Sequence, residues 1–253
     1  AHDTGSAIVA IPSTEKNFVY LNSGTWSIMG IEIDKPIISE QTLQLNYTNE
    51  GGVDGTIRFL KNIMGMWLIQ ESQRIWAECG NVYSWPGMVE LARNSEPFKY
   101  LINPDDPMFL NPRDMTQAVR DFCYQTAQGT PHTHGEIIRC IYDSLALKYR
   151  YTLEQIRDLT DQPIEVIHII GGGSNNHFLN QLTADATGLK VISGPTEATA
   201  IGNIMVQAKA MGHIGSLTEI RKVVADSFDL LEFLPSDELD WDEAYNKYLR
   251  ISL

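Results

Sequence analysis

The chain has 253 residues, with 19 lysines and arginines against 32 aspartates and glutamates, and therefore a formal net charge of −13. Its 43% hydrophobic and 20% charged residues exclude an intrinsically disordered chain, and its length is enough to bury a sizeable core. The acidic balance argues against nucleic acid and anionic membranes as partners, and no apolar stretch approaches the ~18 residues that a membrane-spanning helix needs.

The first predicted elements are three short strands. An apolar run at residues 7–12 ends in a proline, as is typical of a short buried strand. Two more apolar runs, at residues 18–22 and 26–31, are separated only by the sequence Ser-Gly-Thr. Because glycine permits a tight turn, this spacing predicts a β-hairpin with its tip at Gly24.

The clearest predicted helix covers residues 58–78. Apolar side chains recur there with the i, i+3, i+4, i+7 spacing of a helix that packs one face on a core. A second face of this helix carries Asn62 and Gln73, with Gln70 at its edge, and so forms a stripe of amide groups. Contact with solvent is the ordinary explanation of such a stripe.

Almost the whole chain between this helix and the next apolar run is predicted to be helical. Proline-containing segments between the helices are expected to be loops, since proline lacks the N–H group that a helix interior needs. The helices are expected at residues 88–94, 114–127 and 136–149.

The last third of the chain alternates strands with helices, which predicts a parallel β-α-β-α unit. The last helix of this unit contains small residues, so we expect its backbone to lie close to a sheet. The acidic and aromatic tail, residues 237–248, predicts a solvated amphipathic helix. The strands of the unit are expected at residues 164–170 and 190–193, and its helices at 177–187 and 197–211.

The chain has three cysteines, Cys79, Cys123 and Cys140. A secreted disulfide scaffold usually has more cysteines and an even number of them. This usage favours a cytoplasmic protein. We expect three buried thiols, with a Cys123–Cys140 bridge between neighbouring helices as the alternative.

The turn at residues 171–176, Gly-Gly-Gly-Ser-Asn-Asn, lies between a predicted strand and a predicted helix. Glycines at such a place let backbone N–H groups approach an anion or a nucleotide at the positive end of the helix. Asn176 stands where a dinucleotide-binding fingerprint needs a third glycine, and no Lys-Ser/Thr pair completes a P-loop. A nucleotide-binding turn and a tight turn with Ser174 or Asn175 as helix N-cap therefore both stay open.

Two other segments are candidates that are weak when taken singly. The hairpin tip at residues 22–25 offers hydroxyl groups and backbone amides to a phosphate, although such tips are ordinary turn chemistry. Asp3, between His2 and Thr4 and ahead of the first predicted strand, is a candidate base, although composition alone favours a free polar tail.

Five segments form a set that is far more specific than its members. Residues 2–7 read His-Asp-Thr-Gly-Ser-Ala and the hairpin tip reads Asn-Ser-Gly-Thr-Trp-Ser. Residues 62–71 read Asn-x-x-Gly-x-Trp-Leu-Ile-Gln-Glu, the glycine turn follows, and residues 194–200 read Gly-Pro-Thr-Glu-Ala-Thr-Ala. The set resembles the FGGY family of carbohydrate kinases, with Gly5 in a place where we expect alanine.

This resemblance runs over essentially all of the chain, but only over the carboxyl-terminal half of those enzymes. We therefore expect residues 1–253 to be a single carboxyl-terminal kinase domain, from which the amino-terminal sugar-binding domain of the same polypeptide is absent. The implied fold is the actin-like, ribonuclease H-like ATPase domain of the α/β class, with a β-meander, inserted helices and a parallel β-α-β-α unit. The implied activity is transfer of the ATP γ-phosphate to a ketose sugar.

The resemblance also implies roles for particular residues. Asp3 matches the catalytic base that takes the proton of the attacking sugar hydroxyl, and it also contacts the sugar. ATP and Mg²⁺ are the implied cofactors. Because the sequence contains no carboxylate cluster that indicates a metal site, the ion is expected to be held mainly by ATP and water. The expected sugar contacts are His2, Thr4 and Asn62, and the expected ATP contacts are Thr25, Gln70 and Gly172.

Two alternatives to this interpretation remain. One alternative is that the 253-residue chain acts only as a non-catalytic nucleotide-binding module, because a single lobe cannot close over a substrate. A dinucleotide-dependent oxidoreductase is supported only by the glycine turn, and it is opposed by Asn176 and by the lack of an acid after the next strand.

Overall fold

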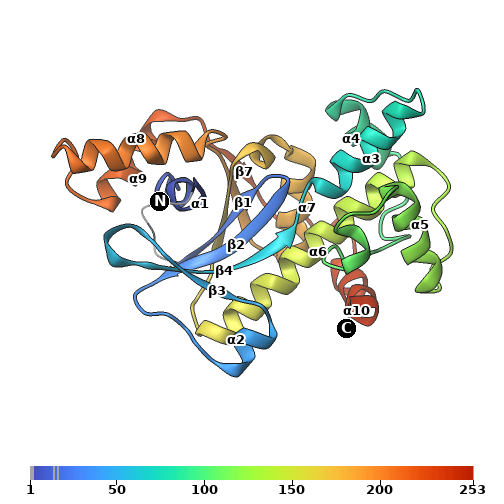
Figure 1. The fold of residues 1–253 in the computed structure, drawn as a ribbon, viewed down its shortest axis with the longest axis horizontal. Helices are drawn as coiled ribbons and strands as arrows, with labels where there is room; N and C mark the ends of the chain where they lie inside the picture. The colour runs from blue at the N-terminus through green and yellow to red at the C-terminus, as the bar shows by residue number, and fades with distance from the viewer. Residues whose placement is uncertain (1–2, 14, 16, 253) are drawn as a thin grey trace.

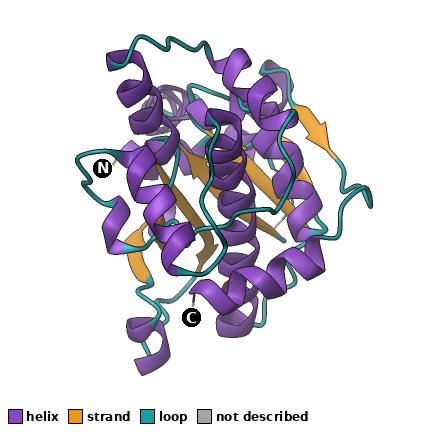
Figure 2. Cartoon of the chain, turned by 90° about the vertical axis from the view of Figure 1, so that its right-hand side faces the viewer, coloured by secondary structure: helices purple, strands orange, loops and turns teal. Residues whose placement is uncertain are grey.

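The structure is a computed structural model that describes residues 3–13, 15 and 17–252. Over these residues it forms an α/β fold around a seven-stranded sheet in the order β3-β4-β2-β1-β5-β6-β7, with helices on both faces (Figures 1 and 2). Strands β1, β5 and β6 are parallel, and the other neighbouring pairs are antiparallel. The strands are β1 Phe18–Ser23, β2 Trp26–Ile33, β3 Thr48–Gly51, β4 Ile57–Met64, β5 Val166–Ile170, β6 Lys190–Ser193 and β7 Leu231–Phe233.

The hairpin and the parallel unit are confirmed. Strands β1 and β2 pair with Ser23 opposite Ser27, and the tip closes through a hydrogen bond of 3.0 Å from the Gly24 N–H to the Trp26 carbonyl. Helices α7 (His177–Thr187) and α8 (Ala198–Ala210) follow β5 and β6 as expected.

The prediction of one helix over residues 58–78 is wrong in its first half, where the chain forms strand β4. Phe59 and Ile63 enter the core on one face of the sheet, while Leu60 enters the core on the other. In a strand buried on both faces the apolar residues need not alternate, and the buried Leu60, Ile63 and Met64 match helical spacing by chance. The helix α3, Trp67–Glu78, begins only after Gly65.

The first predicted strand is also wrong, because residues 3–9 form helix α1 (Asp3–Val9). Its second half is buried between the sheet and α8, and an apolar run of this length does not distinguish a strand from a buried helix. Among the small residues of α8, Gly202 serves this contact with α1 rather than contact with a sheet. A β-carbon on Gly202 would lie 1.8 Å from the Ser6 carbonyl oxygen, so only glycine permits the approach.

The other predicted helices are present, with differences at their ends. Helix α6 extends well beyond the prediction and begins at a capping box formed by Thr133 and Glu136. The tail helix is not merely solvated, because it buries Trp241, Tyr245 and Tyr248. Helices α2 and α9 and the edge strands β3 and β7 were not predicted. The bounds are α2 Glu40–Gln44, α4 Trp85–Arg93, α5 Met115–Gln125, α6 His134–Thr160, α9 Leu217–Ser227 and α10 Trp241–Ser252.

Two hydrophobic cores lie on opposite faces of the sheet. The larger core joins the sheet to α3, α4, α5, α6, α7 and α10, and the smaller joins it to α1, α8 and α9 (Figure 1). Cys123 and Cys140 are buried free thiols in the larger core, whereas Cys79 is exposed, which corrects the expectation of three buried thiols. None of the described helices is both long and apolar enough to cross a membrane.

Candidate functional site

A cavity of about 700 Å³ opens at the end of the sheet where β1 and β5 finish. Ligands of α/β proteins bind outside the carboxyl ends of parallel strands, and this cavity has that position. The hairpin tip, α3, α4, the glycine turn and α7 supply its walls. The lining residues are Gly24, Thr25, Met66, Gln70, Trp85, Pro86, Val89, Glu90, Arg93, Gly172, Gly173, Asn175, Asn176, His177 and Phe178.

The cavity brings together Thr25, Gln70 and Gly172, which are the residues expected to contact ATP. The hairpin tip is joined directly to the start of α3. The Met66 N–H donates to the Gly24 carbonyl at 3.0 Å, and the Trp67 N–H donates to the Thr25 carbonyl at 3.0 Å. Gln70 lies one helical turn later, so the same junction positions both the hydroxyl and the amide.

The three glycines of the turn differ in their surroundings. Gly171 has φ +83°, and Gly173 packs so closely on β1 that an added β-carbon would lie 2.0 Å from the Ser23 hydroxyl. A β-carbon on Gly172 would meet no atom within 4 Å. Gly172 is therefore the member of the turn whose backbone is open to a ligand in the cavity.

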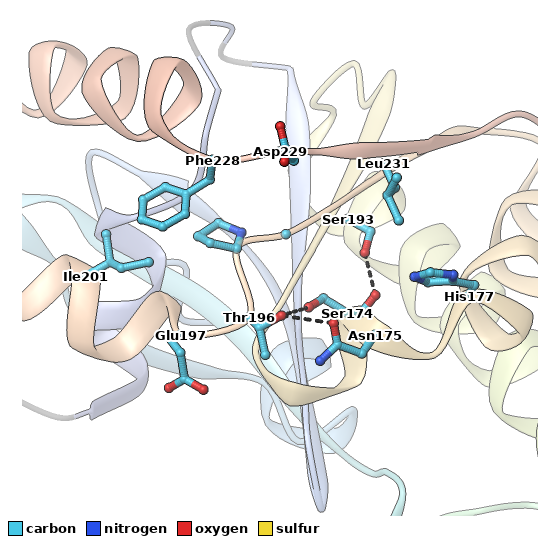
Figure 3. Close-up of a pocket in the computed structure, with 12 residues that line it drawn as sticks. Ser174, Asn175, His177, Ser193, Thr196, Glu197, Ile201, Phe228, Asp229 and Leu231 are labelled. Carbon is cyan, nitrogen blue, oxygen red and sulfur yellow. Dashed lines mark hydrogen bonds between the residues drawn. The ribbon is translucent and has the colours of Figure 1, made fainter. Parts of the chain in front are cut away.

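Hydrogen bonds tie the glycine turn to the segment after β6 (Figure 3). The Thr196 hydroxyl donates to Asn175 Oδ1 at 3.1 Å and shares a hydrogen bond of 3.2 Å with the Ser174 hydroxyl. The Ser193 hydroxyl donates to the Ser174 carbonyl at 2.6 Å. These contacts line a smaller hollow of about 280 Å³ on the other side of the turn.

The N-cap of α7 is Asn176, not Ser174 or Asn175. Its Oδ1 accepts from the Leu179 N–H at 3.1 Å, while its Nδ2 donates to the Tyr142 hydroxyl at 3.0 Å. Asn176, which stands where a dinucleotide fingerprint needs glycine, thus stabilises the start of α7, the helix that borders the cavity.

One wall of the cavity is apolar and was missed by the sequence analysis. Helix α4 contributes Trp85 and Val89, and α7 contributes Phe178, whose ring lies 4.7 Å below the Arg93 guanidinium carbon. Flat apolar walls with a few polar groups at the rim suit a planar ring system. The sequence pattern predicted most of helix α4. It did not reveal that Trp85 is 42% exposed, which is the property that would have marked this residue as part of a binding wall.

Of the residues expected to contact sugar, Asp3, Thr4 and Asn62 lie on the α1 face of the sheet. Along β4, alternate residues share a face, so Arg58, Leu60 and Asn62 point to the same side. Leu60 belongs to the core under α1, whereas Asn62 is exposed on this face. Because Asn62 is on a strand, the stripe of amides that would join it to Gln70 on one helix does not exist.

Asp3 begins α1 and is exposed. Its Oδ1 accepts a hydrogen bond of 2.8 Å from the Thr4 N–H. The Thr4 hydroxyl accepts from Arg58 Nη1 at 3.3 Å, which links this end of α1 to the face that carries Asn62. His2 lies outside the described residues.

Among the described residues, no cluster of histidine, cysteine, aspartate and glutamate is arranged to hold a metal ion. The cavity offers the Thr25 hydroxyl, side-chain amides and backbone N–H groups, which are donors to anionic oxygens.

Comparison with known proteins gives a family and close relatives. Residues 19–211 match the carboxyl-terminal domain of the FGGY family of carbohydrate kinases. The chain is 51% identical to a rhamnulokinase from Bacteroides thetaiotaomicron over 96% of its own length and 50% of the relative. It is 46% identical to a rhamnulokinase from Bacillus subtilis over 93% of its length and 48% of the relative. The chain thus spans about half the length of the curated relatives it matches.

Solved structures share the fold at low sequence identity. A xylulose kinase from Rhodospirillum rubrum superposes with a TM-score of 0.71 at 15% identity, over 99% of this chain and 50% of that one. A Plasmodium falciparum glycerol kinase with ADP gives 0.65 at 14% identity, over 99% of this chain and 50% of that one. The expected α/β fold of a sugar-kinase lobe is therefore confirmed.

Proposed function

The chain belongs to the FGGY family of carbohydrate kinases, and from this premise we propose that it is the nucleotide-binding lobe of an ATP-dependent kinase of ketose sugars. The observation that carries the proposal is the convergence of Thr25, Gln70 and Gly172 on one cavity. These residues come from the hairpin tip, from α3 and from the turn after β5, and nothing but the fold brings them together.

The cavity fits a purine nucleoside triphosphate. Trp85, Val89 and Phe178 offer apolar surface to a base, and the Thr25 hydroxyl and the open backbone at Gly172 offer donors to phosphate oxygens. Bound ATP supplies the phosphoryl group, and Mg²⁺, carried by its phosphates and water, offsets their charge. The location that we propose for such an enzyme is the cytoplasm.

Asp3 is the proposed catalytic base, and together with His2, Thr4 and Asn62 it is proposed to bind the sugar. Phosphoryl transfer passes through a loose transition state, so alignment of the acceptor matters more than early removal of its proton. Asp3 accordingly orients the sugar hydroxyl and accepts its proton as the bond to phosphorus forms. The sugar then lies on the α1 face, with Asn62 on the strand beneath it.

The proposed substrate is L-rhamnulose, with L-rhamnulose 1-phosphate as product. The rhamnulokinase names of the relatives at 51% and 46% identity support this choice, as does the motif from Asn62 to Gln70. L-Fuculose is the alternative, because a fuculokinase of the same family is expected to share the His-Asp-Thr and Ser-Gly-Thr-Trp segments. The remaining part of the site is proposed to come from an amino-terminal domain of the same polypeptide.

Calorimetry of this chain with ATP·Mg²⁺ tests the nucleotide site. We expect the wild-type chain to bind and Gly172→Val to bind at least about tenfold more weakly, a loss of about 1.4 kcal/mol, because the new side chain enters the cavity. Its melting temperature should not change, since the β-carbon meets no atom within 4 Å.

Gly215→Ala is the matched control, because its β-carbon meets only the end of the Glu219 carboxylate, at 3.3 Å, away from the cavity. Equal affinity in Gly172→Val and the wild type would refute the assignment of the cavity.

A coupled ADP assay of the intact enzyme with L-rhamnulose, L-fuculose and D-xylulose tests the substrate, and preference for either of the last two would refute L-rhamnulose.

A further inference from the structure

Arg58 is a buried arginine at the start of β4 whose guanidinium group joins two separate elements. Its side chain is 3% exposed and forms an ion pair of 2.6 Å between Nη2 and Glu50 Oε2. Its Nε donates to the Gly51 carbonyl at 3.3 Å, and its Nη1 donates to the Thr4 hydroxyl at 3.3 Å. Two of the three contacts hold strand β3, and the third reaches helix α1.

The contact to α1 is made next to the proposed base. Thr4 follows Asp3 directly, and its N–H donates to the Asp3 carboxylate at 2.8 Å. At Gly5 an added β-carbon would lie 3.3 Å from Arg58 Nη2 and 3.4 Å from Cζ, so the backbone of this turn rests against the guanidinium group. The place where the family resemblance leads us to expect alanine is filled here by glycine, which leaves room for that contact.

An ion pair that served only the β3–β4 edge would not account for this arrangement. Burial of a guanidinium group costs free energy that is recovered only when the charge is paired and its donors are used. The guanidinium group of arginine has donors in several fixed directions, and here Nη1 donates to Thr4 of α1 rather than to the edge of the sheet. Lysine or an apolar residue would not make both sets of contacts.

The position of Arg58 on the strand relates it to the rest of the site. It shares the α1 face of β4 with Asn62, which lies farther along the strand toward the hairpin tip. The tip carries Thr25 and faces the nucleotide cavity. The proposed base, sugar contact and phosphate contact therefore follow one another in the direction of β4, from Arg58 toward the hairpin tip.

We propose that Arg58 is a positioning residue that holds the first turn of α1, and with it the Asp3 carboxylate, against the sheet during sugar phosphorylation. This inference rests on the proposed function. Arg58 acts through Thr4 and Gly5 and does not touch the reacting atoms.

The test compares Arg58→Met and Arg58→Lys in the intact two-lobed enzyme. We expect kcat to fall about 10²-fold in Arg58→Met, since a misplacement of about 1 Å at a reacting group has that effect, and to fall less in Arg58→Lys. The KM for ATP and the affinity for ATP measured by calorimetry should stay as in the wild type, because Thr25, Gln70 and Gly172 do not depend on this contact.

Arg150→Met is the matched control for loss of a guanidinium group. Arg150 pairs with Glu154 and with Asp242 of α10, on the far side of the molecule from α1 (Figure 1). We expect this variant to lower the melting temperature and to leave kcat unchanged.

Three outcomes would overturn the inference. The first is a kcat within threefold of the wild type in folded Arg58→Met. The second is that kcat and ATP affinity both decrease in proportion to the decrease in melting temperature, since this would indicate a purely structural role. If Arg58→Met does not fold, full kcat in folded Arg58→Lys would decide against it. An intact wild-type enzyme without sugar-dependent ADP production would instead refute the proposed function, and the role of Arg58 with it.

Discussion

At the level of single residues, the three neighbouring glycines of the glycine turn are chemically identical but have different structural roles. Gly171 supplies a positive φ, Gly173 allows close contact with β1, and Gly172 alone leaves open space. The sequence shows three glycines, and only the family resemblance indicates which of them meets the nucleotide. The structure supports the proposal of Gly172, because only there would a side chain enter the cavity without striking the protein.

Replacement of Asp3 by asparagine in the intact enzyme is expected to lower kcat by about 10²–10⁴-fold, the usual contribution of a positioned general base. The change keeps size and hydrogen bonding and removes the charge that accepts the proton. Melting temperature should be unchanged, because Asp3 is exposed. Sugar-dependent ADP production near the wild-type level would show that another group serves as the base.

His168, in the middle of β5, is expected to make the fold sensitive to acid. Burial, with the Arg221 guanidinium as the next contribution, lowers the pKa of His168 to about 4, against about 6.5 in an unfolded chain. The unfolded state therefore binds the proton more readily, and stability is lost as pH falls from about 6.5 toward 4. The loss between pH 7 and 4.5 is about 2–3 kcal/mol from this group.

Urea unfolding of the wild type and of His168→Leu at both pH values measures this effect. Leucine fills similar space without a titrating group, so the variant should lose about 2–3 kcal/mol less than the wild type between pH 7 and 4.5. Equal losses in the two proteins would show that His168 does not carry the pH dependence.

At the level of elements, two segments show where periodicity is insufficient. Residues 58–64 lie in the segment expected to be helical and form strand β4, whereas residues 7–9 lie in the segment expected to be a strand and form part of helix α1. Both segments carry apolar residues that are buried on more than one side. Alternation and helical spacing are informative only when one side of an element meets water. Helices α4, α5 and α7 each keep a solvent face, and they were predicted correctly.

The contact between α1 and α8 is expected to tolerate no side chain at Gly202. In Gly202→Ala the methyl group would lie 1.8 Å from the Ser6 carbonyl oxygen, and backbone cannot rotate away as a side chain can. We expect a loss of about 1–3 kcal/mol in the free energy of unfolding, although alanine favours a helix by about 1 kcal/mol.

Chemical denaturation of Gly202→Ala beside Gly51→Ala checks this expectation. Gly51 is an edge-strand glycine whose β-carbon would meet no atom within 4 Å, so its variant should stay within about 0.5 kcal/mol of the wild type. A Gly202→Ala protein as stable as the wild type would mean that α1 can move away from α8.

For the whole molecule, the net charge of −13 says little about the nucleotide site. Net charge governs long-range attraction, whereas a phosphate at this cavity would meet backbone N–H groups, the Thr25 hydroxyl and the start of α7. Local dipoles of this kind are not counted in the formal charge. An acidic protein is therefore compatible with an anionic ligand.

The 253-residue chain alone is expected to bind ATP·Mg²⁺ weakly and to show no sugar-dependent ADP production. Sequestration of the reaction from water requires closure of a second lobe over the site, and we propose that an amino-terminal domain supplies that lobe. A coupled ADP assay with and without L-rhamnulose measures this. Robust turnover by the chain alone would refute the proposal that an amino-terminal domain completes the site.

The sequence by itself determined the hairpin, the parallel unit, the helices with one solvent-exposed face and, through its motifs, the family and the residues proposed to contact ATP. These features depend on local turn chemistry and on one-sided burial, both of which leave a mark in neighbouring residues. Tertiary structure alone decided that β4 is a strand, that α1 is a helix and that Arg58 joins them. Their conformations follow from partners distant in the chain, which a local pattern does not record.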